Sequence, residues 1–476
     1  MDEIEVKSSR DYIFLNFFTI LVPVILYPFI TNIITPGEYG NYIFLQSIAM
    51  FTIAICNFGC LVGFKRNYFE CKSNKEKHLL LTSIQIFIVG IFLIVIFINY
   101  IYEDQIFKFL NKSSSSQNFW LLILMGVSLD SISKYYLTFL VNEQNSKLYC
   151  FLLLLKNFFY IIFVLLFFFL DYKILSLIYS LLISNLILFL LILIYQLKKI
   201  QFAFSFNPII KTIKISYPLI FRILFGQLNA KLDKILITLI AGVASTGVYA
   251  IAQSISYFIF QVITSLDKVF ITSLNKKLFS GVRDLKEYLT PFLFISSVAA
   301  ISIIMFNDII YFLLIDEKYH GAGNLVIIFL LYYFFLFFNK ITGTQLIYLK
   351  KMWLIGNLFF LSVISNFFMN ILFIKHFGMM GAAMATLITS IIFTLIQKYF
   401  ADKNMELKIN NKSLYFICIF VLLVSIFQLF INYNFNNVFN LSIFLIKIFI
   451  LIFFVSLAQI LKLFEIKKFY KNFVKF

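Results

Sequence analysis

The sequence predicts an all-α polytopic membrane protein with about 14 transmembrane helices. Hydrophobic residues make up 62% of its 476 residues, and charged residues only 13%. Soluble domains carry about 25% charged residues and have no interior large enough for so much apolar surface. The apolar residues also form separate stretches of about 20, the length of a helix that crosses a bilayer. These stretches lack the two-residue alternation of membrane β-barrels, so helices are expected.

Fourteen apolar stretches account for most of the chain. They lie at about 11–33, 41–63, 79–101, 118–140, 148–170, 174–197, 216–240, 247–270, 291–315, 324–347, 354–374, 379–400, 413–433 and 441–464. The connections between them are short, and no soluble domain interrupts them.

Positive charge is concentrated in alternate connections. One set, which includes both termini, carries 26 of the 40 Lys and Arg residues, and the other set carries only 5. Because Lys and Arg favour the cytoplasmic side, both termini are expected there, with an even number of spans. The net charge of +18 is explained in the same way, together with contacts to anionic lipids, and does not indicate a nucleic-acid partner.

A nine-residue segment occurs twice at an offset of 207 residues. GNYIFLQSI at 40–48 and GVYAIAQSI at 247–255 share five identities, and each opens the second helix of a six-helix set. Six helices between the copies give both the same orientation, which is typical of transporters built from two parallel repeats. The predicted organisation is an N-terminal lobe at 1–200 with helices 1–6 and a C-terminal lobe at 201–405 with helices 7–12. Helices 13 and 14 and a basic cytoplasmic tail then occupy 406–476.

Polar residues inside the spans are the candidate site, because a charge at a helix centre costs about 2.5–3.5 kcal/mol. On the seventh helix Arg222, Asn229 and Asp233 share one helical stripe, and Lys231 lies on another face. Asp130 and Lys134 are four residues apart on the fourth helix and can pair. Lys234 is expected either to line the cavity or to extend towards the outer headgroups, and Lys447 is expected to extend towards those headgroups.

The intramembrane charges sum to a positive value, so a cavity that they line favours an anion. The predicted substrate-binding cations are Arg222, Lys134, Lys156, Lys231 and Lys340. The aspartates Asp130 and Asp233 are candidates either for ion coupling or for structural pairing. Further polar residues expected in the cavity are Asn229, Gln46, Gln253, Tyr42 and Tyr249.

The sequence lacks several motifs that indicate catalysis, nucleotide binding or metal binding. The sequence has no GxxxxGK[ST] phosphate loop and no CxxC pair, and its three histidines are scattered. No outer loop is long enough for a catalytic centre. We therefore expect no enzyme activity, no catalytic residues, no metal site and no cofactor, apart from a coupling ion such as H⁺ or Na⁺.

The chain resembles the Wzx-type flippases of O-antigen and capsular polysaccharides, in the MATE-like exporter superfamily. The segments that carry the resemblance are PGEYGNY at 36–42, NFG at 57–59 with Arg66, YP at 217–218, LDK at 232–234, TGVYAIA at 246–252 and FGMMGAA at 377–383.

The resemblance implies two six-helix lobes that give alternating access in a bacterial inner membrane. The implied cargo is an undecaprenyl-diphosphate-linked oligosaccharide, flipped for O-antigen or other lipopolysaccharide or capsule synthesis. Arg222 is then expected to contact the diphosphate, because guanidinium binds phosphate bidentately. The implied partners are this glycan lipid, membrane lipids, and a polysaccharide polymerase with its chain-length machinery.

Three alternatives remain open. A lipid II flippase would share the fold and the cationic cavity. A small-molecule exporter of the same superfamily would require an acidic cavity if its substrate were cationic. A polysaccharide polymerase or membrane glycosyltransferase would require a large outer loop with catalytic residues.

The charge distribution makes a topological prediction. A cysteine introduced at Ser114 should react with an impermeant thiol reagent added to intact cells, and one at Lys277 should not, because their loops lie on opposite sides. Permeabilised cells provide the control, in which both positions should react. Labelling of the Lys277 position in intact cells would contradict the orientation.

Overall fold

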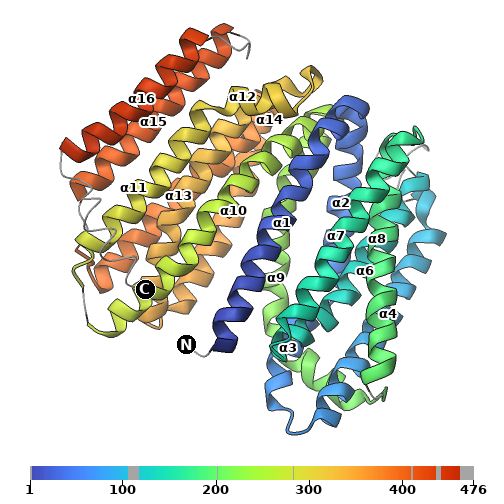
Figure 1. The fold of residues 1–476 in the computed structure, drawn as a ribbon. Helices are drawn as coiled ribbons and strands as arrows, with labels where there is room; N and C mark the ends of the chain where they lie inside the picture. Colours follow the sequence, from blue (N-terminus) through green and yellow to red (C-terminus); the bar gives the residue numbers. More distant parts are fainter. Residues whose placement is uncertain are drawn as a thin grey trace. The chain divides into compact units, whose positions relative to one another are not determined.

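The computed structural model describes residues 3–105, 117–200, 202–281, 283–408, 411–435 and 441–460, and helices dominate them (Figure 1). Each of the fourteen predicted stretches is helical over most of its described length, which confirms the all-α polytopic fold. Two compact units divide the chain, at 1–247 and 248–476.

The first unit contains the helices up to the first turn of α10. Its elements are α1 (Glu3–Ile33), α2 (Pro36–Cys56), α3 (Cys60–Asn67), the short 3₁₀ helix η1 (Tyr68–Glu70), α4 (Asn74–Ile101), α6 (Gln117–Asn142), α7 (Ser146–Phe169), α8 (Ile174–Lys199) and α9 (Phe206–Ile240). Helix α9 packs against α2, α3 and α4, so it belongs to this unit. The predicted boundary at residue 200 follows the sequence repeat instead, and that division stays a prediction.

The second unit begins within α10 (Val243–Phe279). It continues with α11 (Lys286–Met305), α12 (Asn307–Leu314), the 3₁₀ helix η3 (Glu317–Ala322), α13 (Gly323–Tyr348), α14 (Met352–Asn404), α15 (Asn411–Phe435) and α16 (Leu441–Ile460). In Figure 1, α15 and α16 run side by side next to α11, and both pack against it.

Eight helices among the described residues are long and apolar enough to cross a membrane, or nine if α11 and α12 form one bent span. One of the eight is α14, which has 53 residues and is interrupted at Gly378. Gly378 has φ 57° and ψ −139°, which essentially only glycine adopts. This helix therefore contains both predicted spans at 354–374 and 379–400.

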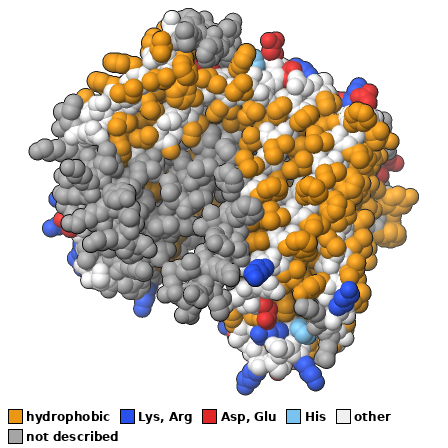
Figure 2. Space-filling view, viewed as in Figure 1, with side chains coloured by type: hydrophobic (Ala, Val, Ile, Leu, Met, Phe, Trp, Pro, Cys, Tyr) orange, Lys and Arg blue, Asp and Glu red, His pale blue; other side chains and the backbone are white. Residues whose placement is uncertain are grey.

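Hydrophobic side chains cover the outside of the first unit, as a lipid-facing surface requires. Figure 2 shows them over α4, α7 and α8, where Leu93, Phe97, Phe158 and Leu190 are exposed. Large exposed apolar surfaces are rare on soluble proteins, so the chain is a multi-pass membrane protein.

A charged cluster ties α4 to α6 at the ends predicted to be cytoplasmic. Glu143 accepts hydrogen bonds from the Tyr68 hydroxyl and from Lys77, whose Nζ lies 3.1 Å from the carboxylate. Lys77 also lies 4.7 Å from the centre of the Tyr68 ring. Partial burial raises the pKa of Glu143, but these hydrogen bonds and the Lys77 charge outweigh it and hold that pKa below its usual value.

Two equivalent glycines of the sequence repeat form a reciprocal contact inside the first unit. A Cβ atom on Gly40 would lie 1.9 Å from the Val243 oxygen, and one on Gly247 would lie 2.1 Å from the Pro36 oxygen. Val243 and Gly247 are the repeat equivalents of Pro36 and Gly40. The starts of α2 and α10 therefore cross so closely that only glycine fits at both positions.

Replacing Gly40 tests this contact. Gly40→Ala should lower the free energy of unfolding by about 1–3 kcal/mol, because the new methyl group collides with backbone. Gly37→Ala, three residues earlier in the same helix, is the matched control, since nothing lies within 4 Å of its added Cβ. Thermal unfolding can be followed with a thiol-reactive dye, because the native thiols of Cys60 and Cys150 are buried. Equal unfolding temperatures for the two variants would contradict the crossing.

Candidate functional site

Asp130 on α6 forms ion pairs with two lysines of the first unit. Its Oδ2 atom lies 2.6 Å from Nζ of Lys134, one turn further along α6, and its Oδ1 atom lies 2.5 Å from Nζ of Lys156 on α7. The predicted pairing of Asp130 with Lys134 is confirmed. Lys156, predicted separately as a cavity cation, joins the same carboxylate.

Helix α9 adds further charge to this unit. The positive charges of Lys134 and Lys231 are close enough to repel each other. The charge of Lys231 also repels that of Lys234. Asp233 is buried, with only 5% of its surface exposed, and its charge acts on Lys234. The side chain of Arg222 lies outside the described residues, so its predicted role stays a prediction.

Two predicted polar residues of α2 lie in a small hydrogen-bonded group. Gln46 donates to the Tyr42 hydroxyl at 3.2 Å, and Tyr42 shares a hydrogen bond with Tyr160 of α7. Tyr42 is buried, Gln46 is half-buried, and Asn229 of α9 is also half-buried. The first unit thus combines lysines of α6, α7 and α9 with amide and hydroxyl groups.

The remaining predicted residues lie in the second unit. Lys340 of α13 lies 4.9 Å from the centre of the Phe260 ring, which stacks on Tyr333 at 4.5 Å. Tyr249 is fully buried and packs edge-to-face on Phe329, while Gln253 is half-buried. Tyr249 is therefore part of the packed interior of this unit.

A buried ion pair in the second unit corrects the prediction for Lys447. Instead of reaching the headgroups, Lys447 of α16 is 1% exposed and its Nζ lies 2.5 Å from Oδ2 of Asp308. Asp308 lies in the first turn of α12, after a 55° bend that separates α12 from α11. Sequence spacing does not predict this pair, because the two residues are 139 positions apart.

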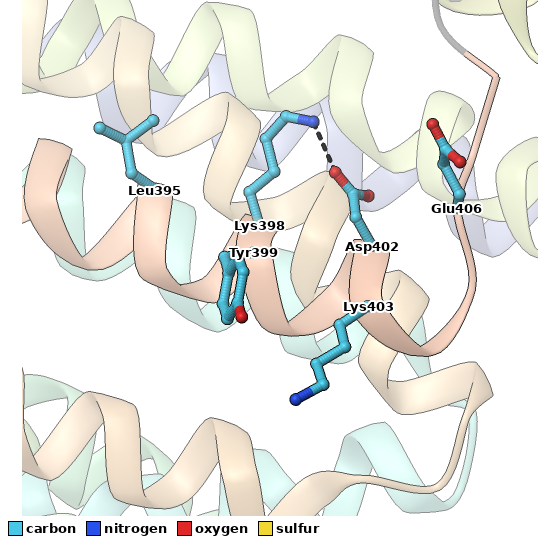
Figure 3. A pocket seen from close by; sticks show the side chains of 6 residues that line it. All are labelled: Leu395, Lys398, Tyr399, Asp402, Lys403 and Glu406. Atoms are coloured by element: carbon cyan, nitrogen blue, oxygen red, sulfur yellow. Dashed lines mark hydrogen bonds and ion pairs between the residues drawn. The ribbon is translucent and has the colours of Figure 1, made fainter.

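A charged pocket of about 570 Å³ lies at the C-terminal end of α14. Figure 3 shows Lys398 pointing to Asp402, with a separation of 2.7 Å, while Lys403 points away from both. Tyr399, Glu406 and Leu395 complete the lining. Both signs of charge are present, and none of the predicted site residues lines this pocket.

The fold and these intramembrane charges indicate the class of membrane protein. Polytopic helices with several lysines and carboxylates inside the spans are typical of transporters, which use such groups to bind a polar cargo in the membrane. Among the described residues, no three His, Cys, Asp or Glu side chains gather as a metal site would require.

The chain belongs to the family of polysaccharide biosynthesis proteins, whose profile matches residues 9–271. This confirms the resemblance to Wzx-type flippases, and the chain is a transport protein rather than an enzyme. No curated protein matches it significantly.

Solved structures of membrane transporters share the fold. The lipid II flippase MurJ in an inward closed conformation superimposes with a TM-score of 0.74 at 17% identity, covering 98% of this chain and 100% of MurJ. An inward-facing multidrug MATE transporter gives 0.62 at 11% identity, covering 82% and 94% of the two chains. A point mutant of the Vibrio cholerae MATE transporter VcmN gives 0.56 at 12%, covering 84% and 98%.

Charge removal tests the Lys447–Asp308 pair. Lys447→Met and Asp308→Leu should each lower the free energy of unfolding by about 3–5 kcal/mol, because each leaves a buried charge without its partner. The double variant Lys447→Met with Asp308→Leu should recover most of that loss. Thermal unfolding in detergent measures both, and Lys398→Met, from a partly exposed pair, is the control. Additive losses in the double variant would show that the pair is not coupled.

Proposed function

We propose that the chain flips an undecaprenyl-diphosphate-linked oligosaccharide repeat unit across the bacterial inner membrane by alternating access. The product serves O-antigen or capsule synthesis, upstream of a polymerase and chain-length machinery. Both termini are cytoplasmic in this proposal, and H⁺ or Na⁺ bound at Asp130 or Asp233 is the candidate coupling ion.

The lysine cluster of the first unit is the observation that carries the proposal. Lys134, Lys156 and Lys231 outnumber Asp130, so the cluster keeps positive charge inside the membrane. A lipid diphosphate has a charged head that does not cross hydrocarbon unaided. Lysines held in protein can replace its hydration, and the family membership supports a glycan as the rest of the cargo.

Lipid II is the second candidate cargo. MurJ, which shares the fold, has it in its name. A cationic small molecule as cargo is disfavoured, because the lysine cluster would repel it.

Reconstituted vesicles test the function. Wild-type protein should expose a fluorescent undecaprenyl-diphosphate oligosaccharide of the inner leaflet to an impermeant quencher, and protein-free vesicles should not.

The same assay tests Arg222. Arg222→Ala should slow the flipping rate by at least about tenfold, or about 1.4 kcal/mol, and Arg222→Lys should be partly active. Lys214→Ala, an exposed position of the same helix, is the matched control. Full activity of Arg222→Ala would exclude its predicted role, and faster flipping of lipid II would favour the second cargo.

A further inference from the structure

Asp130 occupies an unusual position between two lysines of different helices. Each of its carboxylate oxygens takes one ammonium group, Lys134 at 2.6 Å and Lys156 at 2.5 Å. Both ammonium nitrogens are therefore held at the two ends of one carboxylate. An ammonium group has three N–H donors, so each lysine keeps donors for a second anion.

The three side chains of this group are exposed to different extents. Lys134 is 54% exposed, Lys156 is 20% exposed and Asp130 is 24% exposed. Lys134 is thus the most accessible member of the group, and Lys156 and Asp130 are both partly exposed. Lys231 adds charge beside Lys134, and among the described residues it forms no ion pair.

We propose that Asp130 is a positioning and specificity residue that makes Lys134 and Lys156 a clamp for two adjacent phosphoryl groups. This inference rests on the proposed function and deepens it, because it assigns the diphosphate to a pair of lysines and gives the aspartate a role in selection.

Two opposing effects produce the selectivity. The carboxylate fixes the spacing of the two ammonium groups, which lowers the entropic cost of binding a ligand that contacts both. Its negative charge also repels every anion. A diphosphate gains two ammonium contacts and offsets the repulsion, whereas a monophosphate gains one and does not. Anionic phospholipids with a single phosphate, such as phosphatidylglycerol, are disfavoured in the same way.

Removing the carboxylate should weaken this selection. In Asp130→Asn the lysines repel each other and separate, and the site becomes more positive. Diphosphate then loses its preformed clamp, while monophosphate binds more tightly because the repulsion is gone.

Binding of farnesyl diphosphate and farnesyl monophosphate to the purified full-length protein, measured by titration calorimetry, tests the proposal. Wild type should prefer the diphosphate by about tenfold or more in Kd, and Asp130→Asn by no more than about threefold. Asp402→Asn removes a carboxylate from another i,i+4 lysine pair, Lys398–Asp402, and should keep the wild-type ratio.

A second variant guards against misfolding of Asp130→Asn. Lys134 is half exposed, so Lys134→Gln should fold, lose about tenfold in diphosphate affinity and bind monophosphate within about threefold of wild type. A purely structural Asp130 would change both affinities equally and leave their ratio intact. An unchanged ratio in both variants overturns the inference alone, whereas a wild type that binds neither prenyl phosphate overturns the proposed function as well.

Discussion

A charge in hydrocarbon must be compensated by another group of the protein, and this constraint governs both units. A lone lysine at a helix centre costs about 2.5–3.5 kcal/mol. In the first unit Asp130 offsets this cost for Lys134 and Lys156 at once. In the second unit Asp308 does so for Lys447 and thereby links α12 to α16. The two groups differ in their numbers of lysines and aspartates. The Lys447–Asp308 pair is neutral and buried, which suits a structural role. Asp130 with its two lysines keeps a positive charge that can attract an anionic cargo.

Close helix packing is the second requirement, because lipid provides no hydrophobic force between helices. Gly40 and Gly247 allow the start of α2 and the first turn of α10 to meet with backbone in contact. Gly63 of α3 does the same against α9, where an added Cβ would lie 2.7 Å from the Thr212 oxygen. Asn67 donates to the Thr212 hydroxyl at 3.0 Å one turn later. Helix α9, which carries Lys231, packs against α3 at Gly63, so the position of that charge depends on a small residue that carries none.

The sequence predicted what depends on local pattern. The fourteen helical stretches follow from apolar length, and the Asp130–Lys134 pair follows from its four-residue spacing on one helix. It did not predict that Lys156 joins Asp130, because that contact depends on how α6 faces α7. The assignment of Lys447 to the headgroups was wrong for the same reason. Its place near a helix end suggested an outward reach, but its partner Asp308 becomes a neighbour only through the bend between α11 and α12. The repeat at 40–48 and 247–255 is a partial exception, since equivalent glycines in its two copies also meet in space.

A transport site must release its cargo as well as bind it, and this gives the aspartate in a cationic site a physical rationale. Without a carboxylate the lysines of the empty site would face one another unpaired, and in a medium of low dielectric constant their repulsion is screened very little. An empty site of such high free energy would slow the release of the cargo. With Asp130 present, the lysines have a partner of their own to return to when the anion leaves. In the proposed site the same carboxylate therefore lowers the free energy of the empty state and also positions the lysines for the loaded one.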